Sequence, residues 1–151
     1  MASPKNVVVI GGTGGVGRYV IQHASRKGHN VRALVRSKGK FDDAMAQVGM
    51  SAEELSGSGS AGEGASSVNS SGTACGKITV VEGNALKTED VEKVVCDSWG
   101  GKGTDYVFSC LGNVRGEKDF IVESGTKCVL NAVEKLNDGI LPKAATLVCF
   151  V

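Results

Sequence analysis

The sequence predicts an α/β fold with a doubly wound parallel sheet, and three observations support this prediction. Short runs rich in β-branched residues alternate with helical apolar patterns along the 151-residue chain. The first run, Asn6-Val7-Val8-Val9-Ile10, has no polar alternation, which is typical of a central parallel strand covered on both faces. A glycine-rich turn follows this run directly.

The first predicted unit is a strand, a turn, a helix and a second strand within residues 6–36, close to the roughly 30 residues of one βαβ motif. The helix is expected to extend to about Lys27, with Gly28 as its C-terminal stop. The second strand covers residues 31–36. The apolar residues of the helix recur at i, i+4 and i+8 and are Val16, Val20 and Ala24.

The rest of the chain continues the alternation. Thr88 is the expected N-cap of one helix, whose apolar face is Val91, Val94 and Val95. The longest helix is expected to bury Ile121, Cys128, Ala132, Val133 and Leu136. In chain order, the elements predicted after residue 36 begin with a short helix within 37–55, which has a capping box at 51–54. They continue with a strand at 77–82, the helix from Thr88 named above, a strand at 106–110, the longest helix at 119–137 and a strand at 145–151.

The chain is predicted to form a single domain over residues 1–151. Residues 56–76 are mostly Gly, Ser and Ala, so we interpret them as a flexible surface insertion. Right-handed crossovers favour the strand order 3-2-1-4-5. The last strand is then an edge strand that is apolar on both faces. We expect the domain to be C-terminally incomplete, either as a fragment or because a protein partner or self-association covers that strand.

The composition narrows the function classes. A formal net charge of +1 gives no reason to expect nucleic acid or an acidic membrane surface as a partner, and no apolar run approaches the length of a membrane span. The five cysteines form no CxxC pair and no Cys/His cluster of zinc-ligand spacing, so no metal site is predicted. Cysteines in apolar segments indicate a reducing compartment, and we expect a cytoplasmic protein.

The turn Gly12-Thr13-Gly14-Gly15-Val16-Gly17 satisfies the GxGxxG pattern, and Gly11 adds the GxxGxxG spacing. The first glycine permits a tight turn, the middle ones let backbone N–H groups approach a pyrophosphate, and the last allows close helix–strand packing. The next helix offers its N-terminal N–H donors to the phosphates. The flanking strands and helix supply the context of a dinucleotide site, so a Rossmann-like domain is predicted. A phosphate-loop NTPase is excluded, because Arg18 follows Gly17.

The end of the second predicted strand distinguishes the two nicotinamide cofactors. An acidic residue there hydrogen-bonds the ribose 2′-hydroxyl of NAD, whereas a basic residue suits the 2′-phosphate of NADP. This chain has Arg36, Lys38 and Lys40, and its next carboxylate is Asp42. Because a guanidinium can meet a phosphate with two parallel hydrogen bonds, the sequence favours NADP(H) over NAD(H).

Residues 10–17 together with residues 31–36 resemble the NmrA-like, atypical branch of the short-chain dehydrogenase/reductases. A narrower resemblance is to the flavin reductase/biliverdin IXβ reductase group. Residues 80–86 are similar to the group's "VVxGD" segment, 109–112 to its strand-four turn, and 124–133 to its next helix. The resemblance covers nearly all of the chain except residues 41–76.

This resemblance implies a set of cofactor-binding residues. Arg36 matches the arginine that binds the 2′-phosphate, and Lys40 stands where the group has a second basic residue. Asn84 replaces the usual aspartate near the adenine, and an amide can still accept and donate hydrogen bonds there. The pyrophosphate would lie along Gly11, Thr13, Gly14, Gly15, Val16 and Gly17, and the nicotinamide ribose near Cys110, Leu111 and Gly112.

The chain departs from the family at its C-terminal end. The family places a Ser or Thr just after its fifth strand, and this sequence stops within that strand. The Tyr-x-x-x-Lys pair of many relatives is missing, because Tyr19 leads to His23 and Tyr106 leads to Cys110. His23 and His29 are interpreted as solvated. No catalytic residue is therefore predicted.

Three functional interpretations stay open. The leading one is the cofactor-binding part of an NADPH-dependent oxidoreductase whose acceptor is a flavin or another small molecule. The second is a non-catalytic regulatory module of NmrA type that senses NADP(H) and reports to a partner protein. The third is a truncated product without activity. Shared fold alone does not distinguish the three.

Overall fold

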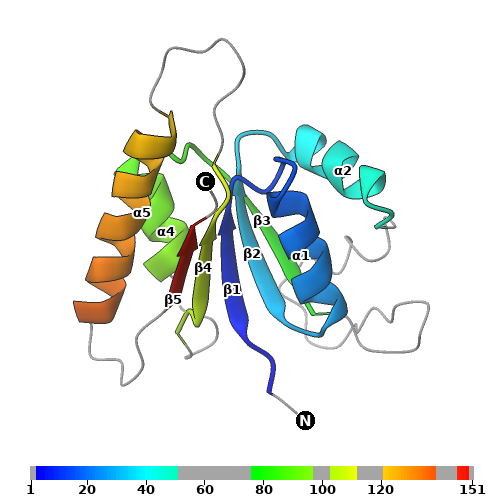
Figure 1. Cartoon of the computed structure of the whole chain (residues 1–151), viewed down its shortest axis with the longest axis horizontal. Coiled ribbons are helices and arrows are strands. Elements are labelled where there is room, and N and C mark those ends of the chain that lie inside the picture. The colour runs from blue at the N-terminus through cyan, green and yellow to red at the C-terminus, as the bar shows by residue number, and fades with distance from the viewer. Residues whose placement is uncertain (1–2, 51–75, 97–102, 112–120, 139–145, 150–151) are drawn as a thin grey trace.

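Helices lie on both faces of a parallel sheet in the computed structural model, which describes residues 3–50, 76–96, 103–111, 121–138 and 146–149 (Figure 1). Helices α1 and α2 lie on one side of the sheet, and α4 and α5 lie on the other. The elements in chain order are β1 (Asn6–Ile10), α1 (Gly17–Arg26), β2 (Asn30–Val35), α2 (Lys38–Gln47), β3 (Ile78–Glu82), α4 (Thr88–Cys96), β4 (Tyr106–Ser109), α5 (Ile121–Asp138) and β5 (Thr146–Cys149).

The strands follow the order β3-β2-β1-β4-β5, and every neighbouring pair is parallel. The predicted order of the first four strands, 3-2-1-4, and the Rossmann-like, doubly wound class are confirmed. β5 adds to the sheet beside β4, with Thr146 opposite Tyr106. Because all strands run the same way, the carboxyl ends of β1 to β4 meet at one edge of the sheet.

The core consists of two clusters, one on each face of the sheet. All five residues of β1 are buried, as its unbroken β-branched run predicts. Val7 and Val9 belong to the cluster under α1 and α2, whereas Val8 and Ile10 belong to the cluster under α4 and α5. This alternation follows from the period of two along a strand.

The helices on the second face confirm most of their predicted core residues. Val91, Val94 and Val95 of α4 are fully buried, and Thr88 is the first residue of that helix. In α5, the predicted Cys128, Ala132 and Val133 are buried together with Val129. The side chains of Ile121 and Leu136 lie outside the described part of the chain.

Two residues of the predicted apolar face of α1, Val20 and Ala24, are partly buried and pack against the core, whereas the prediction for Val16 is wrong. The fully buried residues are Gly17, Ile21 and Ser25, whereas Val16 is 47% exposed. Gly17 must face the turn because a Cβ there would collide with the carbonyl oxygen of Gly11. Residues 17, 21 and 25 are spaced by four and form the buried side of the helix. Two of these are Gly and Ser, which carry no apolar signal.

The end of the predicted flexible insertion is ordered. The Gly76 N–H donates to the Ser25 carbonyl at 2.8 Å, and the Gly76 carbonyl accepts from the Ser25 hydroxyl at 3.2 Å. A Cβ at Gly76 would collide with the carbonyl oxygen of His29. The rest of the insertion and the predicted capping box at 51–54 lie outside the described residues. Gly76 is therefore a structural glycine rather than part of a flexible segment.

The two histidines differ in their environments. His23 is exposed on α1, as expected. His29, interpreted from the sequence as solvated, is half-buried, and its Nδ1 accepts a hydrogen bond from the backbone N–H of Lys5 at 3.2 Å. This bond fastens the segment before β1 to the loop before β2. Within the described ranges, no helix has the length and apolar character needed to cross a membrane.

Candidate functional site

The turn after β1 brings two backbones into close contact. Gly11 has a φ of +81°, and a Cβ there would lie 2.8 Å from the carbonyl oxygen of Cys110. Only glycine meets both conditions without strain. The Gly14 N–H donates to the Gly11 carbonyl at 3.2 Å and closes the turn. The Cys110 N–H donates to the Ile10 carbonyl at 2.8 Å, so the end of β4 is held beside the same turn.

The other glycines of the turn have different surroundings. A Cβ at Gly12 would lie 2.8 Å from Cδ1 of Ile21, so Gly12 permits α1 to pack closely on the strand. A Cβ at Gly15 would meet nothing within 4 Å, and Gly15 is exposed. The first turn of α1 contains no acidic residue, and its N-cap, Val16, makes no side-chain cap bond. The N-terminus of α1 therefore carries no side-chain cap or carboxylate of its own, and there is open space beside Gly15.

A pocket of about 210 Å³ lies where the carboxyl ends of β1, β2, β3 and β4 meet. This edge is where open α/β sheets bind ligands. Arg36 is the charged residue among those that line it. The lining residues are Gly11, Gly12, Thr13, Gly14, Leu34, Val35, Arg36, Gly83, Asn84, Ala85, Leu86, Cys110 and Leu111.

The structure brings together seven of the residues selected from the sequence. This pocket holds Gly11, Thr13, Gly14, Arg36, Asn84, Cys110 and Leu111. Gly15 and Val16 instead line a second hollow beside α1, and Gly17 is buried at the start of that helix. Lys40 is exposed in α2 and does not line the pocket. Gly112 lies outside the described residues.

The loop from β2 to α2 carries the positive charge of the site. Arg36 follows β2 and is exposed, and Lys38 and Lys40 are exposed in the first turn of α2. The Lys38 N–H donates to Oε1 of Glu82 at 2.8 Å. Three cationic side chains and one carboxylate therefore surround the N-terminus of α2. The sequence motifs did not single out Glu82, because its partner is 44 residues away in the chain.

Asn84 shapes the loop after β3. Its Oδ1 accepts from the Leu86 N–H at 2.9 Å, which forms an Asx turn, and its own N–H donates to Oδ2 of Asp90 at 2.9 Å. Gly83 joins this loop to β2, because its N–H donates to the Val35 carbonyl at 2.9 Å. The oxygen of Asn84 is therefore used within the loop, and Nδ2 is the group that can donate to a ligand.

Gly125 is a site residue that the motifs did not identify as such. It is buried in α5, and a Cβ there would collide with Cδ1 of Leu111. Leu111 itself lines the pocket. The signal was available in the sequence as an isolated glycine within a helical pattern, which often has a packing reason. No group of His, Cys, Asp and Glu in the described part of the chain has the arrangement of a metal site.

The donor set fits a dinucleotide. The open space at Gly15 and the N-terminus of α1 suit a pyrophosphate, and Arg36 suits a second anionic group. Asn84 offers a donor for a heteroaromatic base. The 210 Å³ pocket is smaller than the second hollow, yet it combines Gly11 to Gly14 of the glycine turn with Arg36 and Asn84.

Comparisons with solved structures support the fold. A short-chain type dehydrogenase/reductase from Mycobacterium ulcerans is 17% identical with a TM-score of 0.62, and it matches 99% of this chain and 52% of its own. A short chain dehydrogenase from Bacillus anthracis is 18% identical with a TM-score of 0.64, with coverages of 97% and 55%. The yeast methylglyoxal/isovaleraldehyde reductase complexed with NADPH is 14% identical with a TM-score of 0.58, with coverages of 95% and 37%.

The chain thus spans about half, or less, of the length of these structures. A search of the curated proteins gives no match. The sequence model of the NmrA-like family matches residues 3–135, which include the glycine turn, Arg36, Asn84 and Leu111. Fold and family match agree, and the chain belongs to the NmrA-like family.

Proposed function

We propose that this chain is the NADP(H)-binding domain of an NADPH-dependent oxidoreductase whose acceptor is a flavin or another small molecule. The observation that carries the proposal is the pocket that joins the glycine turn to Arg36. The chain spans about half of the matched dehydrogenases, and the role that we assign to its residues is cofactor binding.

The phosphates have separate partners in this proposal. The pyrophosphate lies along Gly11 to Gly14 in the pocket and extends to the open space at Gly15, near the positive end of the α1 dipole. The exposed Arg36 binds the 2′-phosphate with two parallel hydrogen bonds. Lys40 is exposed on α2 outside the pocket lining, so it acts on the same phosphate as a longer-range charge.

The ends of β3 and β4 position the two rings in this proposal. Asn84 donates from Nδ2 toward the adenine, because its oxygen is held by the Leu86 N–H. Cys110 and Leu111, which line the pocket, lie near the nicotinamide ribose in this proposal. Gly125 allows Leu111 to keep its position, because a Cβ at residue 125 would collide with the Leu111 side chain. The cofactor supplies a hydride when bound, and the protein orients it and excludes water.

A regulatory module of NmrA type that binds NADP(H) without turnover is the second candidate. Arg36 is the charged residue of the described pocket lining, so the residues there are suited to binding rather than to proton transfer. A cytoplasmic location is also part of the proposal. It is supported by the burial of Cys110 and Cys128 as small apolar side chains.

Thermal unfolding of the chain with NADP⁺, NADPH, NAD⁺ and NADH tests the binding proposal. A ligand that binds only the folded state stabilises it, by about 2.7 kcal/mol when present at a hundredfold excess over its Kd. We expect a raised Tm with NADP⁺ and NADPH and a smaller rise with NAD⁺ and NADH. Arg36→Asp should abolish the difference between the two pairs.

Lys93→Asp is the matched control, because Lys93 is an equally exposed cation on α4, away from the pocket. It should retain the response of the unaltered chain. No change in Tm with any nucleotide contradicts the proposal. Turnover then separates the two candidates. Loss of NADPH absorbance with added flavin supports the reductase, and binding without loss supports the regulatory module.

A further inference from the structure

Asn84 is the polar side chain that the loop after β3 brings to the pocket of about 210 Å³. The other pocket-lining residues of this loop are Gly83, Ala85 and Leu86, which have no side-chain hydrogen-bonding group. Leu86 is 42% exposed, so it offers an apolar surface to a flat ring beside the amide. A base that lies against this loop therefore meets one side chain that can hydrogen-bond to its polar edge.

The hydrogen bonds of the loop determine which way the amide of Asn84 is turned. The Leu86 N–H can only donate, so its partner at 2.9 Å is the amide oxygen Oδ1 and not the amide nitrogen. The backbone of Asn84 is held as well, because its N–H donates to Oδ2 of Asp90 at 2.9 Å and its carbonyl accepts from the Lys87 N–H at 3.0 Å. Among the residues that the structure describes, no hydrogen bond involves Nδ2. The group that Asn84 can offer to a ligand is therefore a donor.

The polar edge of a purine shows whether the protein group beside it is a donor or an acceptor. Adenine carries a 6-amino group that donates, together with ring nitrogens that accept, whereas a 6-oxopurine such as hypoxanthine has an accepting carbonyl oxygen at position 6. The Nδ2 group can donate to a ring nitrogen of either base or to the 6-carbonyl oxygen, but it cannot accept from the 6-amino group. A carboxylate at this position has only acceptors, so it would bind the amino group and repel the carbonyl oxygen.

We propose that Asn84 sets the base selectivity of this site by donating from Nδ2 to an acceptor of the purine, so that the site takes 6-oxopurine dinucleotides as well as adenine dinucleotides. This inference rests on the proposed function, because it concerns the base of the same nucleotide. It widens the class of cofactor to the deaminated form, nicotinamide hypoxanthine dinucleotide phosphate.

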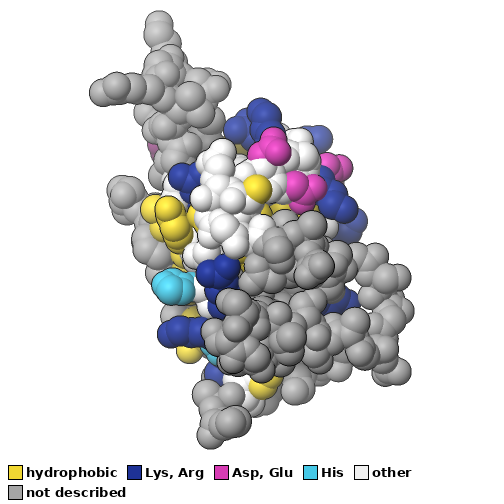
Figure 2. All heavy atoms as spheres, turned by 90° about the vertical axis from the view of Figure 1, so that its right-hand side faces the viewer, with side chains coloured by type: hydrophobic (Ala, Val, Ile, Leu, Met, Phe, Trp, Pro, Cys, Tyr) yellow, Lys and Arg dark blue, Asp and Glu magenta, His cyan; other side chains and the backbone are white. Residues whose placement is uncertain are grey.

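The positive charges of the site do not contribute to this selectivity. Arg36, Lys38 and Lys40 are exposed, and Figure 2 shows Lys and Arg side chains at the surface of the side that carries α2, beside Asp and Glu side chains. These charges act on the phosphates, which the adenine and hypoxanthine dinucleotides share. The ratio of the two dissociation constants therefore depends on the base alone.

Isothermal titration of the whole chain with NADP⁺ and with nicotinamide hypoxanthine dinucleotide phosphate tests the proposal. For the unaltered chain, we expect the two Kd values to lie within about twofold of each other. Asn84→Asp should make the Kd for the hypoxanthine dinucleotide about tenfold higher than that for NADP⁺, because its carboxylate accepts from the 6-amino group and repels the 6-carbonyl oxygen. The carboxylate can still accept the Leu86 N–H, so the loop and the fold should be retained, as circular dichroism can verify.

Asn131→Asp is the matched control, because it makes the same change from amide to carboxylate. Asn131 is exposed on α5 and is not among the residues that line the pocket. This variant should leave the ratio of the two Kd values unchanged.

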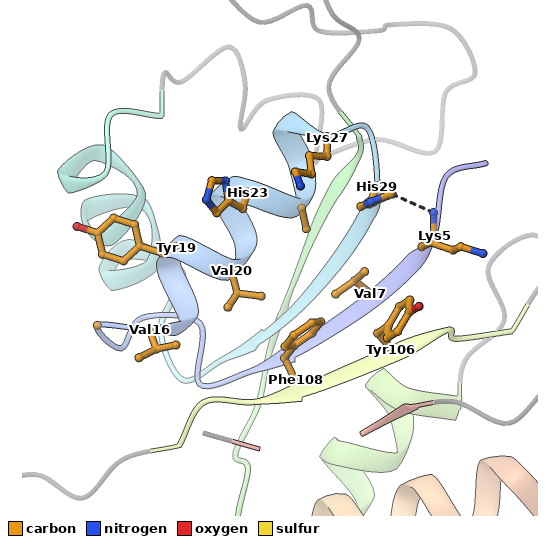
Figure 3. A pocket seen from close by; sticks show the side chains of 12 residues that line it. Lys5, Val7, Val16, Tyr19, Val20, His23, Lys27, His29, Tyr106 and Phe108 are labelled. Atoms are coloured by element: carbon orange, nitrogen blue, oxygen red, sulfur yellow. Dashed lines mark hydrogen bonds between the residues drawn. The ribbon is translucent and has the colours of Figure 1, made fainter. Parts of the chain in front are cut away.

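The experiment also distinguishes the pocket from the larger hollow beside α1, whose volume is about 760 Å³. The walls of that hollow come mainly from α1, β1 and β4, and no residue of the loop after β3 lines it (Figure 3). The affinity for a base bound in that hollow would not depend on the side chain at residue 84.

Two results would overturn this inference and leave the proposed function in place. One is a marked preference of the unaltered chain for NADP⁺, which would mean that a backbone carbonyl of the loop accepts from the 6-amino group. The other is a ratio of Kd values that Asn84→Asp does not change, or that Asn131→Asp changes equally. Absence of binding of both nucleotides would overturn the proposed function, and this inference with it.

Discussion

The carboxylate oxygen Oε1 of Glu82 accepts a hydrogen bond from the backbone N–H of Lys38 at 2.8 Å, which ties the end of β3 to the first turn of α2. Ser37, at the N-cap of α2, makes no side-chain cap bond, so Glu82 satisfies one of the N–H groups that a cap would serve. Glu82 is paired in register with Val35 and thus lies next to Arg36. A negative charge already occupies the neighbourhood in which a 2′-phosphate is proposed to bind.

Glu82→Gln is expected to strengthen binding of NADP⁺ and to leave binding of NAD⁺ nearly unchanged. The amide oxygen can still accept the Lys38 N–H, whereas the charge that repels the 2′-phosphate is removed. Exposed charges near a helix N-terminus contribute roughly 0.3–1 kcal/mol, so a gain of about two- to fivefold in affinity is expected. Isothermal titration of both nucleotides measures it.

Glu89→Gln, an exposed carboxylate in the first turn of α4, is the control for Glu82→Gln. It should leave the NADP⁺ to NAD⁺ ratio unchanged. Weaker NADP⁺ binding by Glu82→Gln would contradict the prediction. It would mean that the carboxylate orders the loop more than it repels the phosphate.

Two glycines of the turn should respond to alanine in opposite ways. Gly17→Ala introduces a Cβ that collides with the Gly11 carbonyl oxygen, so it should lower the free energy of unfolding by roughly 1–3 kcal/mol. Gly15→Ala places its Cβ in open space and should change stability little. Because that space is where the pyrophosphate is proposed to lie, Gly15→Ala should still weaken nucleotide binding. Urea unfolding and nucleotide titration of both variants provide the measurement.

Gly49→Ala serves as a reference for these glycine variants. Its Cβ would also meet nothing within 4 Å, but its φ of +77° makes an alanine there strained. It should lose stability and retain the affinity for nucleotide. Unchanged NADP⁺ affinity in Gly15→Ala would argue against a pyrophosphate in this position.

The contact between Leu111 and Gly125 predicts a compensating pair. Gly125→Ala should lower stability, because the new methyl group collides with Cδ1 of Leu111. Leu111→Ala should also lower stability through lost apolar contacts. The double variant should lose less than the sum of the two, since the smaller residue at 111 makes room for the methyl group. Additive losses in a urea double-mutant cycle would show that α5 shifts instead.

Local sequence patterns predicted the elements of the site but not its long-range contacts. The burial of Val7–Ile10 and of Val91, Val94 and Val95 could be predicted from side-chain type and spacing alone. This burial is confirmed. In α1, the burial of Gly17 and Ser25 was missed, because it follows from close approach and hydrogen bonding and not from hydrophobicity.

In the candidate site too, local patterns were predicted and long-range contacts were not. The motif located the turn from Gly11 to Gly17, and strand order placed Arg36, Asn84 and Leu111 at the same sheet edge. Val16 was selected for the pyrophosphate, yet it is 47% exposed and lines the hollow beside α1 rather than the pocket. The bond from Lys38 to Glu82 depends on tertiary structure and has no local signal.

The ion pair between α4 and α5 predicts a change in stability at alkaline pH. Lys135 Nζ donates to Oε2 of Glu92 at 2.9 Å, and this hydrogen bond, with the Coulomb attraction of Glu92, raises the pKa of Lys135 above 10.5. A raised folded-state pKa means that the stabilisation is complete below pH 10.5 and is lost as the pH rises through the folded-state value.

Glu92→Gln should remove part of this pH dependence. Below pH 10.5, the urea midpoint of this variant should be slightly lower than that of the unaltered chain. At higher pH the two midpoints should converge. The effect should be small and should shrink with salt, because the Lys135 side chain is 64% exposed. Glu123→Gln, which removes the partner of Lys127 within α5 itself, is the matched control. A midpoint difference that widened above pH 10.5 would show that Glu92 stabilises the helix pair by another contact.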